Sequence, residues 1–380
     1  MKRKNIVDII FLLTLSIILL GGFINPIINS TDINYIENRT ANKLPILTTE
    51  TFSNNQFQNN LELALADQIP LAHYMKLANK TLFLLTKINY FNFNNNSINL
   101  EQGLYLMNDY LIYYPKDIES NKKNIELKIK NYNNLANKYK NIDFYLYYIE
   151  KDTDINFQNN NKLGIYEQIK QLLNSNINSS KFNINNFDEF KKYFYKTDHH
   201  WNYQGSYKAY KEILALLEIN DNPIEPLYDK CIGYWSGSKA RSLGGQLLFK
   251  ENLCVYNFDF SKHDIYINNS QIDYDYSYNL ENYANEISYA GFYGADSGLI
   301  KYEYYNEDRD NLLIIGESYD NAINELLASH FNKTYNVDLR NYENDIGEKF
   351  NFDEFVIVNE IDKVLFIGNI DFYIMNTFLI

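Results

Sequence analysis

The apolar positions at the start of the chain form one long stretch. It runs from Ile6 to Ile28 and follows the basic start Met1-Lys2-Arg3-Lys4. A helix needs about 20 apolar residues to cross a membrane, and the stretch reaches that length only with its flanking positions. Positive charge before it predicts a cytoplasmic N-terminus and a single-pass chain that continues outside the cell. We expect residues 1–28 to be an uncleaved membrane anchor rather than a cleaved signal peptide, because no small-x-small site follows.

Residues 29–100 carry a polar and then an amphipathic pattern. The part up to about residue 55 is polar and turn-rich, which suits a linker. From Gln56 to Phe83, apolar residues recur near helical spacing, with a break at Pro70. These patterns predict an extracytoplasmic linker and a short helical stem.

From residue 101 to residue 380, short apolar runs alternate with longer amphipathic segments. Strands are predicted at 103–106, 144–149, 253–258, 264–267, 311–315, 334–339 and 364–367. Helices are predicted at 118–139, 162–173, 187–194, 204–217, 321–331 and 353–360. Residues 221–310 are otherwise irregular. The alternation predicts an α/β domain with a mostly parallel sheet flanked by helices.

Composition narrows the classes of function. Hydrophobic residues make up 46% of the chain, enough for a sizeable core, so a disordered chain is excluded. The formal net charge of -13 repels nucleic acid, and no nucleic-acid partner is expected. Cys231 and Cys254 could form one disulfide outside the cell or remain two buried thiols. Since no Cys-x-x-Cys pair occurs, we expect no structural zinc site. No cofactor is expected.

One cluster stands out among the five histidines of the chain. Asp198, His199 and His200 are consecutive, and Trp201 and a predicted helix follow them. In an extended segment, residues two apart point to the same side. Asp198 can therefore orient His200 through one ring nitrogen and leave the other nitrogen free as a base. His199 is expected to point the other way, and Trp201 to be a packing residue.

Ser318 is the candidate nucleophile. It lies in the turn Gly316-Glu317-Ser318-Tyr319, between the predicted strand 311–315 and a predicted helix. A serine at such a turn sits at the carboxyl end of a parallel sheet, where open α/β sheets bind ligands. Serine is a weak nucleophile and needs a base, which His200 supplies. The two motifs together predict a serine-hydrolase-like site made of Asp198, His200 and Ser318.

A metal site is the alternative interpretation of the Asp198-His199-His200 cluster. The same three letters name the Asp-His-His phosphoesterases, which hold two metal ions with further aspartates at upstream strand ends. The sequence has no convincing Asp-x-Asp or Asp-His cluster of that kind upstream. The serine site is therefore the leading interpretation, and no metal is expected.

With these motifs, the chain resembles the DHHW protein family, which is related to the alginate O-acetylation proteins AlgJ and AlgX and to SGNH hydrolases. The resemblance rests on Asp198-His199-His200-Trp201 and on the serine turn, where the family commonly has Gly-Asp-Ser and then an aromatic residue. Further blocks that match are Glu37-Asn38-Arg39 with Pro45, Asp67-Gln68-Ile69-Pro70, Gly237-Ser238 with Arg241 and Gly244, and Asp338-Leu339-Arg340. The sequence departs from the pattern at Glu317, where the family has aspartate, and after Pro70, where an arginine is absent.

The resemblance implies an SGNH-like three-layer α/β/α domain over residues 101–380. It also implies an esterase or O-acyltransferase that acts on acetyl groups of a cell-surface polysaccharide, with an integral-membrane acyl-donor partner as in the alginate systems. Candidate groups for the oxyanion or the substrate are Gly316, Gly237, Ser238 and Arg241, while Glu317 and Tyr319 are expected to support the serine turn. A catalytically silent polysaccharide-binding or assembly protein with the same fold stays the alternative.

Overall fold

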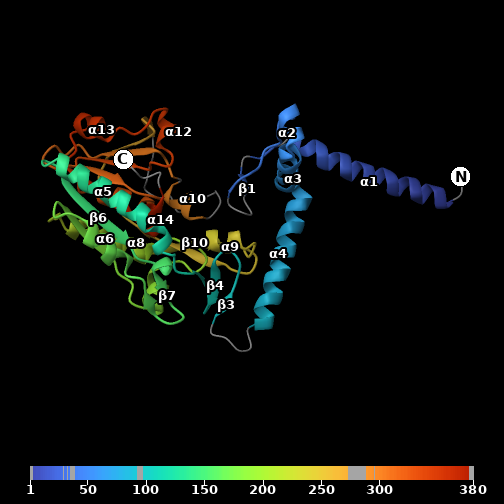
Figure 1. Cartoon of the computed structure of the whole chain (residues 1–380), viewed down its shortest axis with the longest axis horizontal. Helices are drawn as coiled ribbons and strands as arrows, with labels where there is room; N and C mark the ends of the chain where they lie inside the picture. The colour runs from blue at the N-terminus through green and yellow to red at the C-terminus, as the bar shows by residue number, and fades with distance from the viewer. Residues whose placement is uncertain are drawn as a thin grey trace. The chain divides into compact units, whose positions relative to one another are not determined.

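The structure, a computed structural model, describes residues 3–28, 30–31, 33–34, 39–91, 97–272, 288–294 and 296–375. The chain divides into two compact units. The first comprises Met1–Gln102 and Ser236–Lys250, and the second comprises Gly103–Trp235 and Glu251–Ile380. The first unit therefore includes a segment that is inserted in the chain between two parts of the second; Figure 1 labels the elements of both. The predicted boundaries at residues 28 and 100 stay predictions.

Helices make up most of the first unit. Its elements are α1 (Arg3–Ile28), α2 (Thr49–Ser53), α3 (Gln56–Gln68), α4 (Pro70–Phe91), α9 (Ser238–Ser242) and the two-residue strands β1 (Ile33–Asn34), β2 (Arg39–Thr40) and β3 (Ile98–Asn99). The predicted break is found, because Pro70 begins a new helix, where a missing N–H costs nothing. No helix among the described residues combines the length and the apolarity needed to cross a membrane. Glu37 and Asn38 lie outside the described residues.

The end of α3 organises the polar segment that precedes it. Asp67 is buried and accepts hydrogen bonds from the Asn34 side chain at 3.0 Å and from the Asn42 N–H at 2.9 Å. Gln68 accepts from the Thr31 N–H at 2.8 Å and donates to the Asn42 carbonyl at 3.0 Å. The linker is therefore held to the helix by the first two side chains of the Asp-Gln-Ile-Pro block.

The second unit is built on an eight-stranded sheet with the order β13-β12-β14-β16-β15-β17-β6-β9. Its strands are β6 (Asp143–Ile149), β9 (Ile177–Phe182), β12 (Asp264–Ile267), β13 (Ser270–Ile272), β14 (Leu299–Glu303), β15 (Asn311–Ile315), β16 (Lys333–Val337) and β17 (Lys363–Gly368). The five strands from β16 to β9 are parallel, and β14, β12 and β13 continue the sheet in antiparallel pairing. The prediction of a mixed α/β fold with a mostly parallel sheet is confirmed.

Helices pack on both faces of this sheet, which gives three layers (Figure 1). They are α5 (Lys122–Lys138), α6 (Ile165–Leu172), α7 (Phe187–Tyr193), α8 (Tyr203–Leu216), α11 (Asn324–Ala328), α12 (Tyr342–Ile346), α13 (Phe352–Val358) and α14 (Ile370–Ile374). In β6, Leu146 packs with residues of α5 and α6, whereas Tyr145 and Tyr147 pack with residues of α7 and α8. Because successive strand residues point to opposite faces, burial on both faces explains the nearly continuous apolar runs of the central strands.

Two differences from the predicted elements lie near the candidate site. The helix predicted at 321–331 is instead a 3-10 turn, η3 (Asp320–Ala322), followed by the short α11. The segment expected to be mostly irregular also contains β14, α10 (Tyr289–Tyr293) and β10 (Tyr228–Trp235). β10 pairs antiparallel with β11 (Glu251–Asn257), which lies close to the strand predicted at 253–258. Cys231 and Cys254 are opposite each other in this pair and form a disulfide. Smaller elements of this unit are β4 (Leu104–Met107), β5 (Tyr110–Tyr113), η1 (Glu119–Asn121), η2 (Asp152–Asp154), β7 (Ile155–Asn156) and β8 (Asn161–Lys162).

Candidate active site

Ser318 lies in the turn that follows β15, at the carboxyl end of a central strand of the sheet. A Cβ added at Gly316 would lie 1.9 Å from a carboxylate oxygen of Asp320 and 2.8 Å from Cγ2 of Ile367. Only glycine leaves room for this close approach. The Asp320 N–H donates to the carbonyl of Glu317 at 2.9 Å and closes the turn, in which Ser318 is half-buried.

Asp198 and His200 come from a short hairpin just before α8. Phe194 pairs with Trp201 in an antiparallel bridge, and the N–H of Tyr195 donates to the carbonyl of His200 at 3.2 Å. The residues between these pairs form a tight loop that carries both polar side chains. Asp198 is 3% exposed and His200 is 6% exposed, so both titratable side chains of the loop are buried.

The hydroxyl, the imidazole and the carboxylate follow one another in contact. Oδ1 of Asp198 is 2.7 Å from Nδ1 of His200 and 3.0 Å from its backbone nitrogen. Nε2 of His200 is 2.7 Å from Oγ of Ser318. Because Nδ1 faces a carboxylate, Nδ1 carries the proton, which leaves Nε2 to accept a hydrogen bond from the serine hydroxyl. The fold thus joins residues 118 positions apart.

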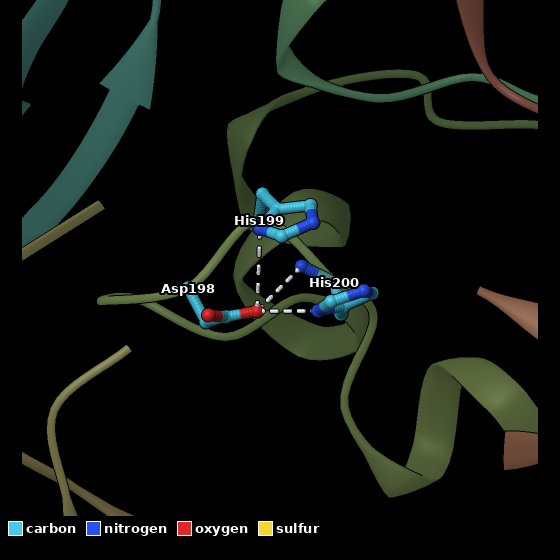
Figure 2. Close-up of side chains that lie close together, drawn as sticks. All are labelled: Asp198, His199 and His200. Atoms are coloured by element: carbon cyan, nitrogen blue, oxygen red, sulfur yellow. Dashed lines mark hydrogen bonds and ion pairs between the residues drawn. The ribbon is translucent and has the colours of Figure 1, made fainter. Parts of the chain in front are cut away.

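His199 does not point away from Asp198, contrary to the prediction. Its Nδ1 is turned toward the same carboxylate oxygen as that of His200, but at 3.7 Å (Figure 2). The side chain of His199 is 33% exposed. The alternation of an extended segment does not hold here, because residues 196–200 form a bend.

The metal alternative can be tested on the same geometry. Within the described part of the chain, Asp198, His199 and His200 form the one group close enough to hold a metal ion, with ligand atoms within 4.8 Å of one another. Two ligands about 2.1 Å from one tetrahedral zinc ion would be roughly 3.4 Å apart. The 2.7 Å between Asp198 and His200 is instead a hydrogen-bond distance. The arrangement therefore fits a shared proton better than a metal ion.

Aromatic rings enclose the imidazole of His200. Tyr289 of α10 stacks on it, with ring centroids 3.8 Å apart and planes 1° apart. Tyr319 lies 4.9 Å away, and its hydroxyl donates to the carbonyl of His199. Trp201 is fully buried and meets Tyr319 edge to face at 5.3 Å. These rings exclude water around the imidazole and restrict its movement.

Glu317, which departs from the family pattern, joins the serine turn to the next strand of the sheet. Its carboxylate accepts hydrogen bonds from the N–H of Asn369 at 3.2 Å and from the Asn369 side chain at 2.5 Å. Burial raises the pKa of Glu317 to about 7, while the Asn369 hydrogen bond and the positive charges of Lys151 and Arg340 act to lower it. Asn369 directly follows β17 and caps α14, so the turn is fixed to a helix start.

Three adjacent parallel strands, β15, β17 and β6, end at this edge of the sheet. Ser318 follows the first, Asn369 the second and Lys151 the third. Lys151 is 2% exposed, and its ammonium lies 5.6 Å from the ring centroid of Tyr319. Asn369 and Lys151 were not predicted, although each comes just after a predicted strand, which is a signal that could have found them. Tyr289 lies in a segment without a clear pattern, and no such signal marks it.

The other candidate groups for the oxyanion or the substrate fall in two places. Gly316 is part of the serine turn. Gly237 precedes α9, and Ser238 and Arg241 lie in that helix, so all three belong to the first unit. The Nε of Arg241 donates to the carbonyl of Ser236 at 2.8 Å. A role for these residues in substrate binding stays a prediction.

No model of a known protein family matches the chain, and no curated protein sequence matches it. Solved structures do match. PatB1 from Bacillus cereus gives a TM-score of 0.58 at 22% sequence identity, over 74% of this chain and 99% of PatB1. A second PatB1 structure, which has a sulfonyl adduct, gives a TM-score of 0.55 at 20% identity, over 72% of this chain and 98% of that one.

A DHHW family protein from Eubacterium siraeum matches with a TM-score of 0.54 at 16% identity, over 74% of this chain and 95% of that protein. The O-acetyltransferase domain of Pseudomonas putida AlgJ matches more distantly, at a TM-score of 0.40 and 8% identity, over 74% of this chain and 94% of that one. The predicted resemblance to the DHHW family is thus confirmed at the level of the fold. This chain has the three-layer α/β fold of PatB1 and of the DHHW family protein.

Proposed function

We propose that this protein is a serine esterase or O-acyltransferase, with Ser318 as nucleophile, His200 as general base and Asp198 as the group that orients the base. The observation that carries the proposal is the pair of 2.7 Å contacts, one between Asp198 and His200 and one between His200 and Ser318. Both distances are within the reach that proton transfer needs. A carboxylate that fixes the ring tautomer and a free ring nitrogen that faces a hydroxyl together activate a serine.

In the first half-reaction, Oγ of Ser318 attacks the carbonyl carbon of an ester while its proton moves to Nε2 of His200. Asp198 stabilises the positive charge that develops on the imidazole. The former carbonyl oxygen becomes negative, and backbone N–H groups of the serine turn can donate to it. The intermediate then collapses, the bond to the leaving alcohol breaks, and His200 gives that alcohol the proton. An acyl group remains bound to Ser318 as an ester.

In the second half-reaction, the neutral His200 takes a proton from water or from a sugar hydroxyl. The oxygen so activated attacks the acyl carbon, and the second intermediate collapses with return of the proton to Oγ of Ser318. Attack by water releases an acid and makes the protein an esterase. Attack by a sugar hydroxyl forms a new ester and makes it a transferase. The same three residues serve both outcomes, and acceptor positioning decides between them.

We place this reaction at the cell surface, on acetyl groups of a polysaccharide, with an integral-membrane protein as the acyl donor. The motif resemblance to the DHHW family supports the substrate and the partner. Exposed apolar side chains on α1, among them Phe11 and Ile17, support a membrane anchor. The disulfide between Cys231 and Cys254 is typical of an oxidising compartment outside the cell. Alkaline extraction should leave the full-length protein in the membrane fraction and release a chain without residues 1–28.

The test of the nucleophile uses the full-length protein, an aryl acetate and a sulfonyl fluoride, since one PatB1 structure has a sulfonyl adduct. We expect release of acetate, and a sulfonate ester on Ser318 with loss of fluoride. Ser318→Ala should lose both reactions. Ser329→Ala, the same change at a serine whose hydroxyl donates to the Leu326 carbonyl at 2.7 Å, should lose neither.

Three other outcomes would each replace the proposal. Turnover that survives in Ser318→Ala would overturn the assignment of the nucleophile. If a chelator abolishes turnover and Ser318→Ala leaves it intact, the metal-dependent phosphoesterase is favoured. Polysaccharide binding with neither acetate release nor labelling would favour the catalytically silent protein.

A further inference from the structure

The carboxylate of Glu251 holds the backbone of the loop that carries Asp198. Its Oε1 accepts hydrogen bonds from the N–H and from the hydroxyl of Thr197, at 2.7 and 2.5 Å. Its Oε2 accepts from the N–H of Lys196 at 3.0 Å. These two residues directly precede Asp198, so Glu251 fixes the stretch of backbone from which the Asp198 side chain projects.

Other hydrogen bonds also hold the loop, since the Tyr319 hydroxyl donates to the carbonyl of His199 at its outer end. Its base is closed by the bridge between Phe194 and Trp201, and the Lys196 carbonyl accepts from the N–H of Leu111 at 2.9 Å. Thr197 is fully buried. Water therefore cannot replace Glu251 as the acceptor for its N–H and hydroxyl if the glutamate is removed. Hydrogen bonds to a carboxylate are also stronger than those between neutral groups.

Glu251 is itself held in place by the strand pair of β10 and β11. Glu251 begins β11 and is opposite Trp235 of β10, in the pair that the disulfide closes. Trp235 packs edge to face on Tyr195 at 5.1 Å and shares an apolar cluster with Tyr289, the ring that stacks on His200. One strand pair therefore supports both the backbone before Asp198 and the ring beside His200.

We propose that Glu251 is a positioning residue of the candidate active site. It acts on Asp198 through the backbone of Lys196 and Thr197, and on His200 through Asp198. The inference rests on the proposed function, because it gives Glu251 a part in the same proton transfer. A shift of about 1 Å in a supporting group can lower an enzyme rate on the order of 100-fold, so a loop released from Glu251 has a measurable effect.

Steady-state kinetics of full-length Glu251→Ala and Glu251→Gln test this role. We expect Glu251→Ala to lower kcat for an aryl acetate about tenfold or more, because the base is misplaced. KM should change less than about twofold, because no substrate contact is removed. Glu251→Gln keeps an acceptor oxygen and should recover part of kcat. Glu225→Gln, the same change at a glutamate that accepts from the Tyr207 hydroxyl at 2.9 Å, should match the wild type.

Proton NMR separates this inference from the proposed function, because it needs no turnover. The proton that His200 Nδ1 shares with Asp198 should give a far-downfield resonance that is absent from His200→Ala. We expect this resonance to shift or broaden in Glu251→Ala, less so in Glu251→Gln, and to stay unchanged in Glu225→Gln. A shifted resonance in a protein without turnover would support positioning by Glu251 while refuting the enzyme.

The positioning role is overturned if the resonance of Glu251→Ala is the same as that of the wild type. It is also overturned if both Glu251 variants keep the wild-type kcat, whether or not their KM changes. If Glu251→Ala does not fold, the kcat and the downfield resonance of Glu251→Gln and Thr197→Val test the role by the same criteria. Thr197→Val removes the 2.5 Å hydroxyl bond to Glu251 and leaves both N–H donors in place.

Discussion

The imidazole of His200 and the phenol ring of Tyr289 are stacked face to face, with centroids 3.8 Å apart and planes within 1°. Tyr289 is buried, and its hydroxyl donates to the carbonyl of Tyr319 at 3.4 Å. Asp198 fixes which nitrogen of His200 carries the proton, and the stacked ring limits how far the imidazole can rotate. The imidazole that we propose as the base is therefore held by a polar contact at its edge and an apolar contact on its face.

Loss of the stacked ring should slow the reaction. Aromatic pairs contribute about 0.5–1.5 kcal/mol, so Tyr289→Leu should lower kcat roughly two- to tenfold. Tyr289→Phe keeps the ring and removes the hydroxyl with its 3.4 Å contact to the Tyr319 carbonyl, and its kcat should stay near that of the wild type. Aryl acetate kinetics measure both variants. A Phe variant as slow as the Leu variant would assign the effect to the hydroxyl instead.

The two neighbouring histidines should differ greatly in importance. His200→Ala removes the base and should lower kcat by roughly 10⁴-fold or more. His199→Ala removes a ring whose Nδ1 is 3.7 Å from Asp198, and its cost should stay below about tenfold. The rates of acetate release and of sulfonyl labelling compare the two variants. Equal losses would show that His199 shares the role of the base.

Glu317 should make stability depend on pH. Burial raises the pKa of its carboxyl from the ordinary 4.5 to about 7. A raised carboxyl pKa means that the folded state favours the protonated form. This contribution to the free energy of unfolding is therefore complete below pH 4.5 and is lost as the pH rises through 7. The loss amounts to about 3 kcal/mol.

The variant Glu317→Gln isolates this contribution, because its side chain stays neutral and can still accept from Asn369. It should be more stable than the wild type by up to about 3 kcal/mol at pH 8, and the two should converge toward pH 5. Urea unfolding at several pH values measures the difference. Asp154 and Glu325, whose pKa values burial also raises to about 7, are present in both proteins and cancel. A stability difference that is constant with pH would contradict the prediction.

Gly316→Ala should damage both the fold and the site. The added Cβ would lie 1.9 Å from the Asp320 carboxylate, so the serine turn must shift, at a cost of about 1–3 kcal/mol. Gly347→Ala is the matched control, since a Cβ there meets nothing within 4 Å and the cost is that of its positive φ alone. The midpoint temperature of thermal unfolding and the rate of sulfonyl labelling should both fall in Gly316→Ala. Gly347→Ala should lose some stability and keep its labelling rate. Unaltered labelling in Gly316→Ala would mean that the turn tolerates the methyl group.

Removal of the disulfide should destabilise the second unit. Cys231 and Cys254 are 23 positions apart, and a loop of that length contributes about 3 kcal/mol by restricting the unfolded chain. The double variant Cys231→Ala/Cys254→Ala should therefore unfold at a lower urea concentration. A reducing agent should lower the stability of the wild type by a similar amount and leave the variant unchanged. An equal effect on both would indicate that the reagent acts elsewhere.

The central strands could be predicted because their pattern is local. The run 311–315 is apolar at almost every position, and β15 has those bounds. A strand buried on both faces requires such residues. By contrast, β9 reads Ile-Asn-Ser-Ser-Lys-Phe, and its pairing with β6 at the edge of the sheet is what makes it a strand. The sequence of these six residues does not show which strand they will pair with.

The candidate site divides in the same way. The contact of Asp198, His200 and Ser318 could be predicted from residue type and spacing, whereas their catalytic roles stay a proposal. The direction of His199 was wrong, since it depended on an extended backbone that the bend does not provide. Glu251 and Tyr289 could not be named. A tyrosine in a chain with 35 tyrosines is not distinctive until tertiary packing brings it to the imidazole.

The disulfide also changes what a cut in the chain would do. Cys231 and Cys254 flank residues 236–250, which belong to the first compact unit. A peptide bond broken anywhere in that segment leaves one covalently linked molecule, with both strands of the pair still tethered to each other. A protease can therefore cut this segment without releasing the strand that begins at Glu251.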